Sequence, residues 1–292
     1  MIAFCTSLRA RPLSHNWAYH TWLLERTVDS MLAQAGDVRV VIGCHDVPDS
    51  PLTRDPRVHF ERVTIGLPAR TFDDMSVDKV IKHSVAARRA LAEGCDYVIF
   101  NDADDLVSNR VGAFVAANPN ANGWYSASQI FYTYGGRVAR HSSIVPPRSG
   151  PFVVVRRDLI EFNSPPFAGE WLSIVQSGGE LEYLSLLARH QLPVCTLAAA
   201  GHGYYTTLMG RTGRALAPMP FPANLVINHP DSMSTSGGRH GYSAISMLGS
   251  LRRSIKWLPT LRRSGAAMMA EYHVPPDSDI PPAYRGGSVF WR

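Results

Sequence analysis

The segment from Tyr97 to Arg110 reads YVIFNDADDLVSNR and is the most informative part of the sequence for the fold. Its first part, Tyr97–Phe100, is an apolar run of strand-forming residues, which is typical of a buried strand. Polar residues follow at once, with only Ala103 between them: Asn101, Asp102, Asp104 and Asp105. Because three neighbouring carboxylates repel one another, we expect a cation to be held where this strand ends.

The sequence before this stretch alternates between strand-like and helix-like patterns. Apolar runs predict strands at 2–7, 38–46 and 57–65. Apolar residues at helical spacing predict helices at 20–36, 76–94 and 111–118, and Ser76 is placed to cap the second of them. The alternation predicts an α/β fold whose central sheet is mostly parallel and doubly wound, with helices on both faces.

After Gly123 the pattern becomes a mixture of elements. The segment 124–140 is typical of a hairpin that turns at Gly135 and Gly136. Further strands are expected at 150–160, at 193–201 and just before His229, and a helix is expected at 178–192. We therefore divide the chain into a main domain, 1–240, with halves 1–118 and 119–240, and a helical, basic C-terminal extension, 241–292.

The composition limits the classes of protein that fit the chain. Of its 292 residues, 45% are hydrophobic and 18% are charged, which is enough to build a sizeable core. The net charge of +5 suits an anionic ligand or a membrane surface but is too small to indicate nucleic-acid binding. The four cysteines form no CxxC pair, which favours buried, reduced thiols over a zinc site or a disulfide framework.

The chain shows no run of roughly 18 apolar residues and no signal-peptide pattern at its start. We therefore expect it to be cytoplasmic. The segment 243–263 combines apolar residues at helical spacing with several arginines and lysines. Such a helix either lies on an anionic membrane at its inner face or packs its apolar stripe on the main domain.

The acidic cluster has a chemical interpretation as well as a structural one. In open α/β sheets, ligands bind at the carboxyl ends of the strands, where Asp102 and Asp104 are expected to point the same way. Divalent cations that also hold phosphates prefer one or two protein carboxylates together with oxygens of the substrate. The alternative is that the aspartates only cap a strand end or a helix N-terminus.

The segment CDYVIFNDADD resembles the DxD region of GT-A-fold nucleotide-sugar glycosyltransferases, in particular the family 2 type. In the same way, SVDKVIKHSVAARRAL resembles the helix whose basic residues approach the nucleotide, and GELEYLSLLARHQLPV resembles the helix of the catalytic Glu-Asp motif. The resemblance covers the order of elements over residues 1–230. It implies a GT-A-like fold, with a Rossmann-like nucleotide-binding half followed by a mixed acceptor half.

The resemblance also implies an activity. The chain would be a metal-dependent glycosyltransferase of the hexosyltransferase type, using Mg²⁺ or Mn²⁺ and a UDP- or GDP-linked sugar donor. It would transfer the sugar to a glycan or lipid-linked acceptor, with inversion by direct displacement, and would have no nucleic-acid partner. Two alternatives remain open: a nucleotidyltransferase of similar fold, and a non-catalytic sugar- or nucleotide-binding protein.

Site residues follow from matching these motifs. The implied metal ligands are Asp104 first, then Asp102, Asp105 and a late histidine, for which His229 is preferred over His202 and His240. The implied contacts to the nucleotide sugar are Arg9, Asp46, Lys79, Lys82, Asp102 and Arg211. For the two lysines the alternative is an ordinary solvated helix face, and for Asp46 it is a simple turn.

The general base is the least defined part of the expected site. The family pattern has an Asp after the Glu, but here Leu181 follows Glu180. The carboxylates that remain as candidates are Glu180, Glu182 and Glu170. If none of them is the base, the enzyme retains the anomeric configuration or takes its base from elsewhere, and Glu180 then only favours the start of its helix.

Overall fold

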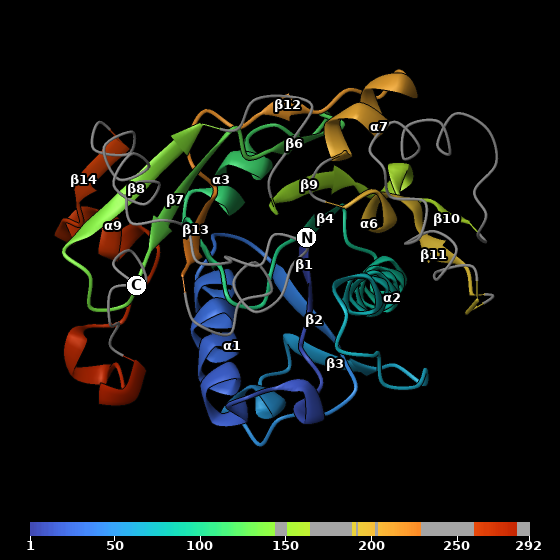
Figure 1. Cartoon of the computed structure of the whole chain (residues 1–292). Coiled ribbons are helices and arrows are strands. Elements are labelled where there is room, and N and C mark those ends of the chain that lie inside the picture. Colours follow the sequence, from blue (N-terminus) through green and yellow to red (C-terminus); the bar gives the residue numbers. More distant parts are fainter. Residues whose placement is uncertain (144–150, 164–188, 191, 202–203, 229–259, 285–292) are drawn as a thin grey trace, which may run out of the picture.

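The computed structural model describes residues 1–143, 151–163, 189–190, 192–201, 204–228 and 260–284 (Figure 1). Within these residues the largest sheet has the strand order β12-β6-β9-β4-β1-β2-β3. Its bounds are β1 Ile2–Ser7, β2 Val38–Cys44, β3 Val58–Arg62, β4 Tyr97–Phe100, β6 Gly123–Tyr125, β9 Val153–Arg156 and β12 Ala217–Pro218.

The sheet is mostly parallel, as the sequence predicts. Among the described residues, four of its six strand pairings are parallel. These include every pairing among the first four strands: β1 with β2, β2 with β3, and β1 with β4. The antiparallel strand β9 lies between β4 and β6. The predicted contrast between a parallel first half and a mixed second half is therefore confirmed.

Helices cover both faces of this sheet (Figure 1). Alternate residues of β1 point to opposite sides, so Phe4 packs with α1 (Trp17–Leu32), whereas Cys5 packs with α2 (Phe72–Ala92). The short helix α3 (Val111–Ala116) lies in the same core cluster as α1. Among the described residues, no helix is long and apolar enough to cross a membrane.

The boundaries of the two long helices are set by residues that accept hydrogen bonds from the first turn. The side chain of Asn16 accepts from the amide of Tyr19 at 3.0 Å, so α1 begins earlier than predicted. The prediction that Ser76 caps the second helix is wrong. Thr71 is the cap and accepts from the amide of Asp74 at 3.1 Å, with acidic residues in the first turn.

A second sheet lies beside the first and has the order β14-β8-β7-β13-β5 in the described part of the chain. Its bounds are β5 Leu106–Val107, β7 Ser128–Tyr132, β8 Val138–Ser143, β13 Asn224–Ile227 and β14 Leu261–Arg263. The antiparallel pairing of β7 with β8 confirms the predicted hairpin, whose turn contains Gly135 at φ 76°. The strand before His229 is also confirmed.

Residues 260–284 contribute to this second sheet and its core. The last part of the helix predicted at 243–263 is wrong, because Leu261–Arg263 form strand β14 and pair with β8. Residues 243–259 of that predicted helix lie outside the described residues. Helix α9 (Ala266–Glu271) follows, and the hydroxyl of Tyr272 donates to the carbonyl of Pro222 at 2.7 Å. The boundary proposed at residue 240 stays a prediction.

The remaining elements flank α2 and β9. The expected strand at 193–201 is wrong beyond Cys195, because the alanine-rich segment that follows forms a buried helix, α6. The bounds here are β10 Phe162–Asn163, β11 Val194–Cys195, α6 Thr196–Ala200 and α7 Tyr205–Arg211. Short 3-10 helices lie at Arg11–Leu13, Pro51–Arg54, Arg157–Leu159, Asp277–Asp279 and Pro282–Tyr284.

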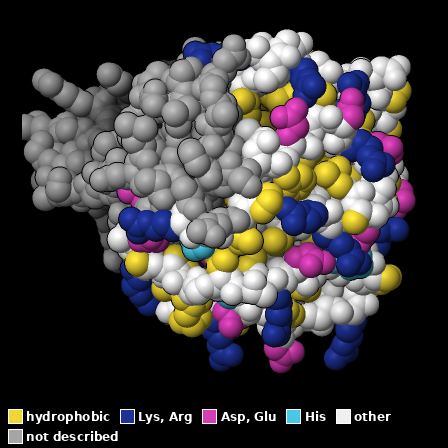
Figure 2. Space-filling view, turned by 90° about the vertical axis from the view of Figure 1, so that its right-hand side faces the viewer, with side chains coloured by type: hydrophobic (Ala, Val, Ile, Leu, Met, Phe, Trp, Pro, Cys, Tyr) yellow, Lys and Arg dark blue, Asp and Glu magenta, His cyan; other side chains and the backbone are white. Residues whose placement is uncertain are grey.

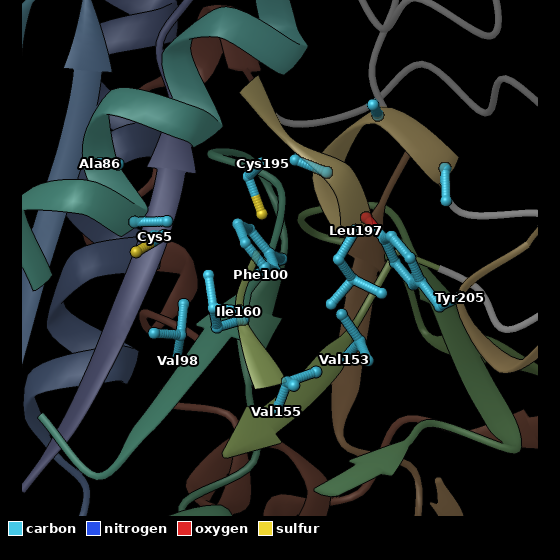
Figure 3. Packing of buried hydrophobic residues seen from close by; sticks show 14 of the residues in the cluster. Cys5, Ala86, Val98, Phe100, Val153, Val155, Ile160, Cys195, Leu197 and Tyr205 are labelled. Atoms are coloured by element: carbon cyan, nitrogen blue, oxygen red, sulfur yellow. The ribbon is translucent and has the colours of Figure 1, made fainter. Parts of the chain in front are cut away.

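The core between α2 and β9 is apolar and contains sulfur. Figure 3 shows Cys5 and Cys195 among Phe100, Val153 and Leu197. All four cysteines are buried free thiols, as expected. On the face shown in Figure 2, basic and acidic side chains are interspersed around a patch of hydrophobic ones, so the net positive charge does not form one continuous surface there.

Candidate functional site

The candidate site is the edge at which β1, β2 and β4 end. Because these strands are parallel and adjacent, their carboxyl ends meet there. The strand order reverses at β1, which has β2 and β3 on one side and β4 on the other. A doubly wound sheet opens a crevice at such a point, and ligands bind in it. Asp102 follows the end of β4 at this edge.

Asp102 is paired with Lys79, the predicted nucleotide contact on α2. The ammonium group of Lys79 forms an ion pair with Oδ1 of Asp102, and each side chain is about a quarter exposed (25% and 26%). An ion pair this accessible to solvent contributes at most about 1 kcal/mol, so a ligand can replace it at little cost. The structure therefore brings together two of the predicted site residues in an exchangeable contact.

Asp104 is also partly exposed, whereas Asp105 is buried beneath it. Oδ2 of Asp105 accepts from the amide nitrogen of Asn224 at 3.2 Å, and Oδ1 accepts from the backbone N–H of Ile227 at 3.3 Å. Burial raises the pKa of Asp105 well above its ordinary value, and the nearby charges of Asp104 and Asp102 raise it further. Of the three aspartates, Asp102 and Asp104 are the ones that face solvent.

Lys82 lies under the strand ends. Its side chain is 1% exposed and donates to Oδ2 of Asp78 at 2.5 Å and to the carbonyl of Leu8 at 2.9 Å. The other oxygen of Asp78 lies 2.7 Å from Nε2 of His45. Burial lowers the pKa of Lys82, although Asp78 opposes that shift. The ammonium group of Lys82 thus connects α2 to the end of β1, and through Asp78 to the end of β2. The predicted contact of Lys82 with a nucleotide stays a prediction.

The close approach of α2 to β2 depends on Gly43. A side-chain carbon at this position would overlap the backbone carbonyl of Lys82. The glycine therefore lets the helix that carries Lys79 lie directly on the strand that leads to His45 and Asp46.

The other predicted nucleotide contacts divide into two groups. Arg9 and Asp46 follow β1 and β2 at the candidate edge, both partly exposed, and Asp46 accepts from the amide of Arg11 at 2.9 Å. Arg211 ends α7, and three residues later Arg214 pairs with Glu161 at 2.8 Å. Arg214 lies toward the amino end of β4, so the structure does not place this turn beside Asp102.

The remaining predicted residues, Glu170, Glu180, Glu182 and His229, lie outside the described residues, as do His202 and His240. Strand β13 ends at Ile227, two residues before His229, and the backbone amide of Ile227 donates to Asp105. Within the described ranges no three His, Cys, Asp or Glu side chains are arranged to hold a metal ion.

Asp102 and Asp104 nevertheless fit a hard divalent cation chemically. They offer carboxylate oxygens at a partly exposed turn, and a cation that also binds a substrate diphosphate needs only one or two such ligands. The positive charge of Lys79 already lies against Asp102. The site thus has the charge and the accessibility to bind either a cation or a cation–phosphate pair.

Sequence reasoning missed three polar residues of this region: His45, Asp78 and Asn224. The pairing of Asp78 with Lys82 has a sequence signal, since residues four apart on a helix are neighbours. For Asn224 we find no such signal, because it reaches Asp105 from a strand 119 positions further along the chain.

No protein-family model matches the chain, and neither does any curated protein. Comparison with solved structures returns S. aureus TarS and a mannosyltransferase, each at low sequence identity. S. aureus TarS (residues 1–349) is 9% identical, with 77% of this chain and 60% of that one covered at a TM-score of 0.40. The same TarS segment in complex with UDP is 10% identical, with 78% and 61% covered at a TM-score of 0.38.

The mannosyltransferase PcManGT from Pyrobaculum calidifontis, in complex with GDP-Man and Mn²⁺, is 13% identical, with 89% of this chain and 62% of that one covered at a TM-score of 0.39. The chain thus spans less than two thirds of these proteins. All three TM-scores are below 0.5, so the proposal that follows is drawn from the residues and the strand order of this chain.

Proposed function

We propose that the chain is a metal-dependent glycosyltransferase that transfers a sugar from a UDP- or GDP-linked donor to a glycan or lipid-linked acceptor. The observation that carries this proposal is the position of Asp102 and Asp104. They are partly exposed carboxylates directly after β4, at the point where the strand order of the parallel sheet reverses. Lys79 supplies a positive charge beside them.

In this proposal Asp104 and Asp102 hold Mg²⁺ or Mn²⁺. When bound, the metal neutralises the charge that develops on the departing nucleoside diphosphate. Lys79 leaves its exchangeable pair with Asp102 and turns to the phosphates, while Arg9 and Asp46 hold the nucleoside at the ends of β1 and β2. The buried contacts of Lys82 keep those two strand ends in place.

The acceptor side of the proposal rests on residues outside the described ranges. A carboxylate among Glu170, Glu180 and Glu182 removes the proton from the acceptor hydroxyl, and the sugar is transferred with inversion by direct displacement. His229 completes the metal site. The protein acts in the cytoplasm, and the segment 243–263 provides a peripheral contact with the inner face of the membrane.

A donor-turnover assay tests the proposal. The protein is incubated with UDP- and GDP-sugars in Mn²⁺ or in EDTA, and the released nucleoside diphosphate, sugar and pyrophosphate are measured. We expect metal-dependent release of UDP or GDP from one sugar donor, lost in Asp104→Ala and kept in Asp158→Ala. Asp158 is an exposed matched control toward the amino end of β4.

The products separate the proposal from its alternatives. When the protein is instead given a sugar phosphate and UTP or GTP, pyrophosphate release would identify a nucleotidyltransferase. Binding of a donor without any turnover, in the presence of candidate glycan acceptors, would identify a non-catalytic binding protein. Either outcome would contradict the proposed function.

A further inference from the structure

The carboxylate of Asp105 lies in a fully buried polar contact between the turn after β4 and strand β13 of the second sheet. Asp105 is 3% exposed and Asn224 is 0% exposed. Asp105 directly precedes β5 and lies next to Asp104, whereas Asn224 opens β13, which pairs antiparallel with β5. The contact therefore connects the acidic turn after β4 to a strand from the second half of the chain.

Both oxygens of Asp105 are already used in this contact. One accepts from the side-chain amide of Asn224 at 3.2 Å and the other from the backbone N–H of Ile227 at 3.3 Å. If Asp105 turned toward a ligand at the surface, these two buried donors would lose their acceptor. Leaving buried donors unpaired is costly, so the arrangement opposes such a rotation.

The turn is also held by the side chain of Asn101. The amide nitrogen of Asn101 donates to the carbonyls of Asp102 and Asp105, both at 2.9 Å, and Asn101 is fully buried. The acidic turn is thus fixed at its first residue by Asn101 and at its last by the contact of Asp105 with β13. Of the three aspartates, Asp102 and Asp104 are the partly exposed ones, whereas Asp105 is buried.

We infer that Asp105 is a positioning residue and not a metal ligand: it attaches the acidic turn, Asp102–Asp105, to β13 and so holds Asp102 and Asp104 in place relative to that strand. This inference rests on the proposed metal-dependent function. It assigns Asp105 a different role from Asp104, although the two are adjacent and chemically identical.

Exchanging the side chains of Asp105 and Asn224 distinguishes a positioning role of Asp105 from a role as a metal ligand. In Asn224→Asp two carboxylates face each other in the buried contact and repel. In the double variant Asp105→Asn/Asn224→Asp the amide and the carboxylate have changed places. The amide introduced at position 105 donates to the new carboxylate and still accepts from the backbone N–H of Ile227, but the acidic turn no longer carries a carboxylate at this position.

Mn²⁺ alone is the probe, and its binding is followed from the paramagnetic resonance signal of the free ion. Hydrogen exchange at the amide of Ile227 reports the contact independently of any ligand. We expect Asn224→Asp to weaken Mn²⁺ binding about tenfold and to speed exchange at Ile227, since the buried hydrogen bond from the Asn224 side chain is lost. We expect the double variant to restore both, with the Mn²⁺ affinity within about threefold of the unmodified protein.

If Asn224→Asp does not fold, two single variants of the same size and shape, Asp105→Asn and Asp104→Asn, still test the inference. In Asp105→Asn the new side-chain oxygen can still accept from the backbone N–H of Ile227, and the new NH₂ group can donate to the side-chain oxygen of Asn224. We therefore expect this variant to bind Mn²⁺ within about threefold of the unmodified protein. Asp104→Asn, the matched control, removes a proposed ligand and should lose most of the binding.

Three results would overturn the inference. If the double variant protects Ile227 normally but binds Mn²⁺ as weakly as Asp104→Asn, Asp105 is itself a ligand. If Asn224→Asp frees the amide of Ile227 without changing Mn²⁺ binding, the contact does not position the site. If the unmodified protein binds no Mn²⁺ although Ile227 responds as expected, the proposed metal function fails and the positioning role fails with it.

Discussion

The ammonium nitrogen of Lys82 lies 2.5 Å from a carboxylate oxygen of Asp78, one helical turn earlier in α2, and both side chains are buried. The same nitrogen donates to the carbonyl of Leu8, and Asp78 contacts His45, so this pair connects α2 to the ends of β1 and β2. Lys79, three residues earlier on the same helix, is exposed enough to exchange partners. Two neighbouring lysines therefore have different roles.

The first prediction compares these two lysines. Lys82→Met leaves the buried carboxylate of Asp78 without its cation, so we expect the free energy of unfolding to fall by about 3–5 kcal/mol. Lys79→Met removes a partly exposed pair and should cost less than about 1 kcal/mol. Urea denaturation measures both. A Lys82→Met protein that is as stable as the unmodified one but no longer binds nucleotide would show that Lys82 contacts the ligand directly.

The second prediction concerns the contact of α2 with β2. Gly43→Ala forces a methyl group into the backbone of Lys82, and we expect a loss of about 1–3 kcal/mol of unfolding free energy. Gly66→Ala is the matched control, because nothing lies within 4 Å of the added carbon. Thermal or urea denaturation of the two variants checks this. Equal stabilities would mean that the helix does not lie as close to the strand as the structure shows.

The third prediction concerns the buried thiols. Burial raises the pKa of Cys95 and of Cys195 from 9.0 to about 11. At pH 8 only about one in a thousand of these thiols is ionised, so both should react very slowly with iodoacetamide until the protein is denatured. Mass spectrometry of the alkylated sites measures this. Rapid labelling of either cysteine in the folded protein would contradict the core packing.

The same shifts give a dependence of stability on pH. Because the folded-state pKa values lie above the unfolded value, these thiols favour the folded state below pH 9. That contribution is lost as the pH rises from 9 toward about 11. We expect replacement of Cys195 by Ser to make the loss of stability over this interval smaller, as measured by urea denaturation at each pH.

The first half of the fold could be predicted from the sequence because its signals are local. The apolar runs that form β1, β2 and β4 and the helical spacing in α1 and α2 each lie within one element. The errors have local causes too. Ser76 has the chemistry of a cap, but Thr71 lies further upstream and is followed by two acidic residues in the first turn, so the helix begins there.

The candidate site was harder to predict because its contacts are not local. A sequence pattern places three aspartates together but does not show that Asp105 is buried against β13. Nor does it show that Lys82 turns inward while Lys79 turns to Asp102. These differences arise from the way α2 and β13 pack on the strand ends, which depends on residues far apart in the chain.

Calorimetric titration with UDP and with GDP, each with and without Mn²⁺, compares the unmodified protein with Asp104→Ala. We expect one nucleotide to bind only when Mn²⁺ is present and Asp104→Ala to abolish this binding. Binding of neither nucleotide, or binding that is unchanged by both Mn²⁺ and the loss of Asp104, would contradict the proposed donor site.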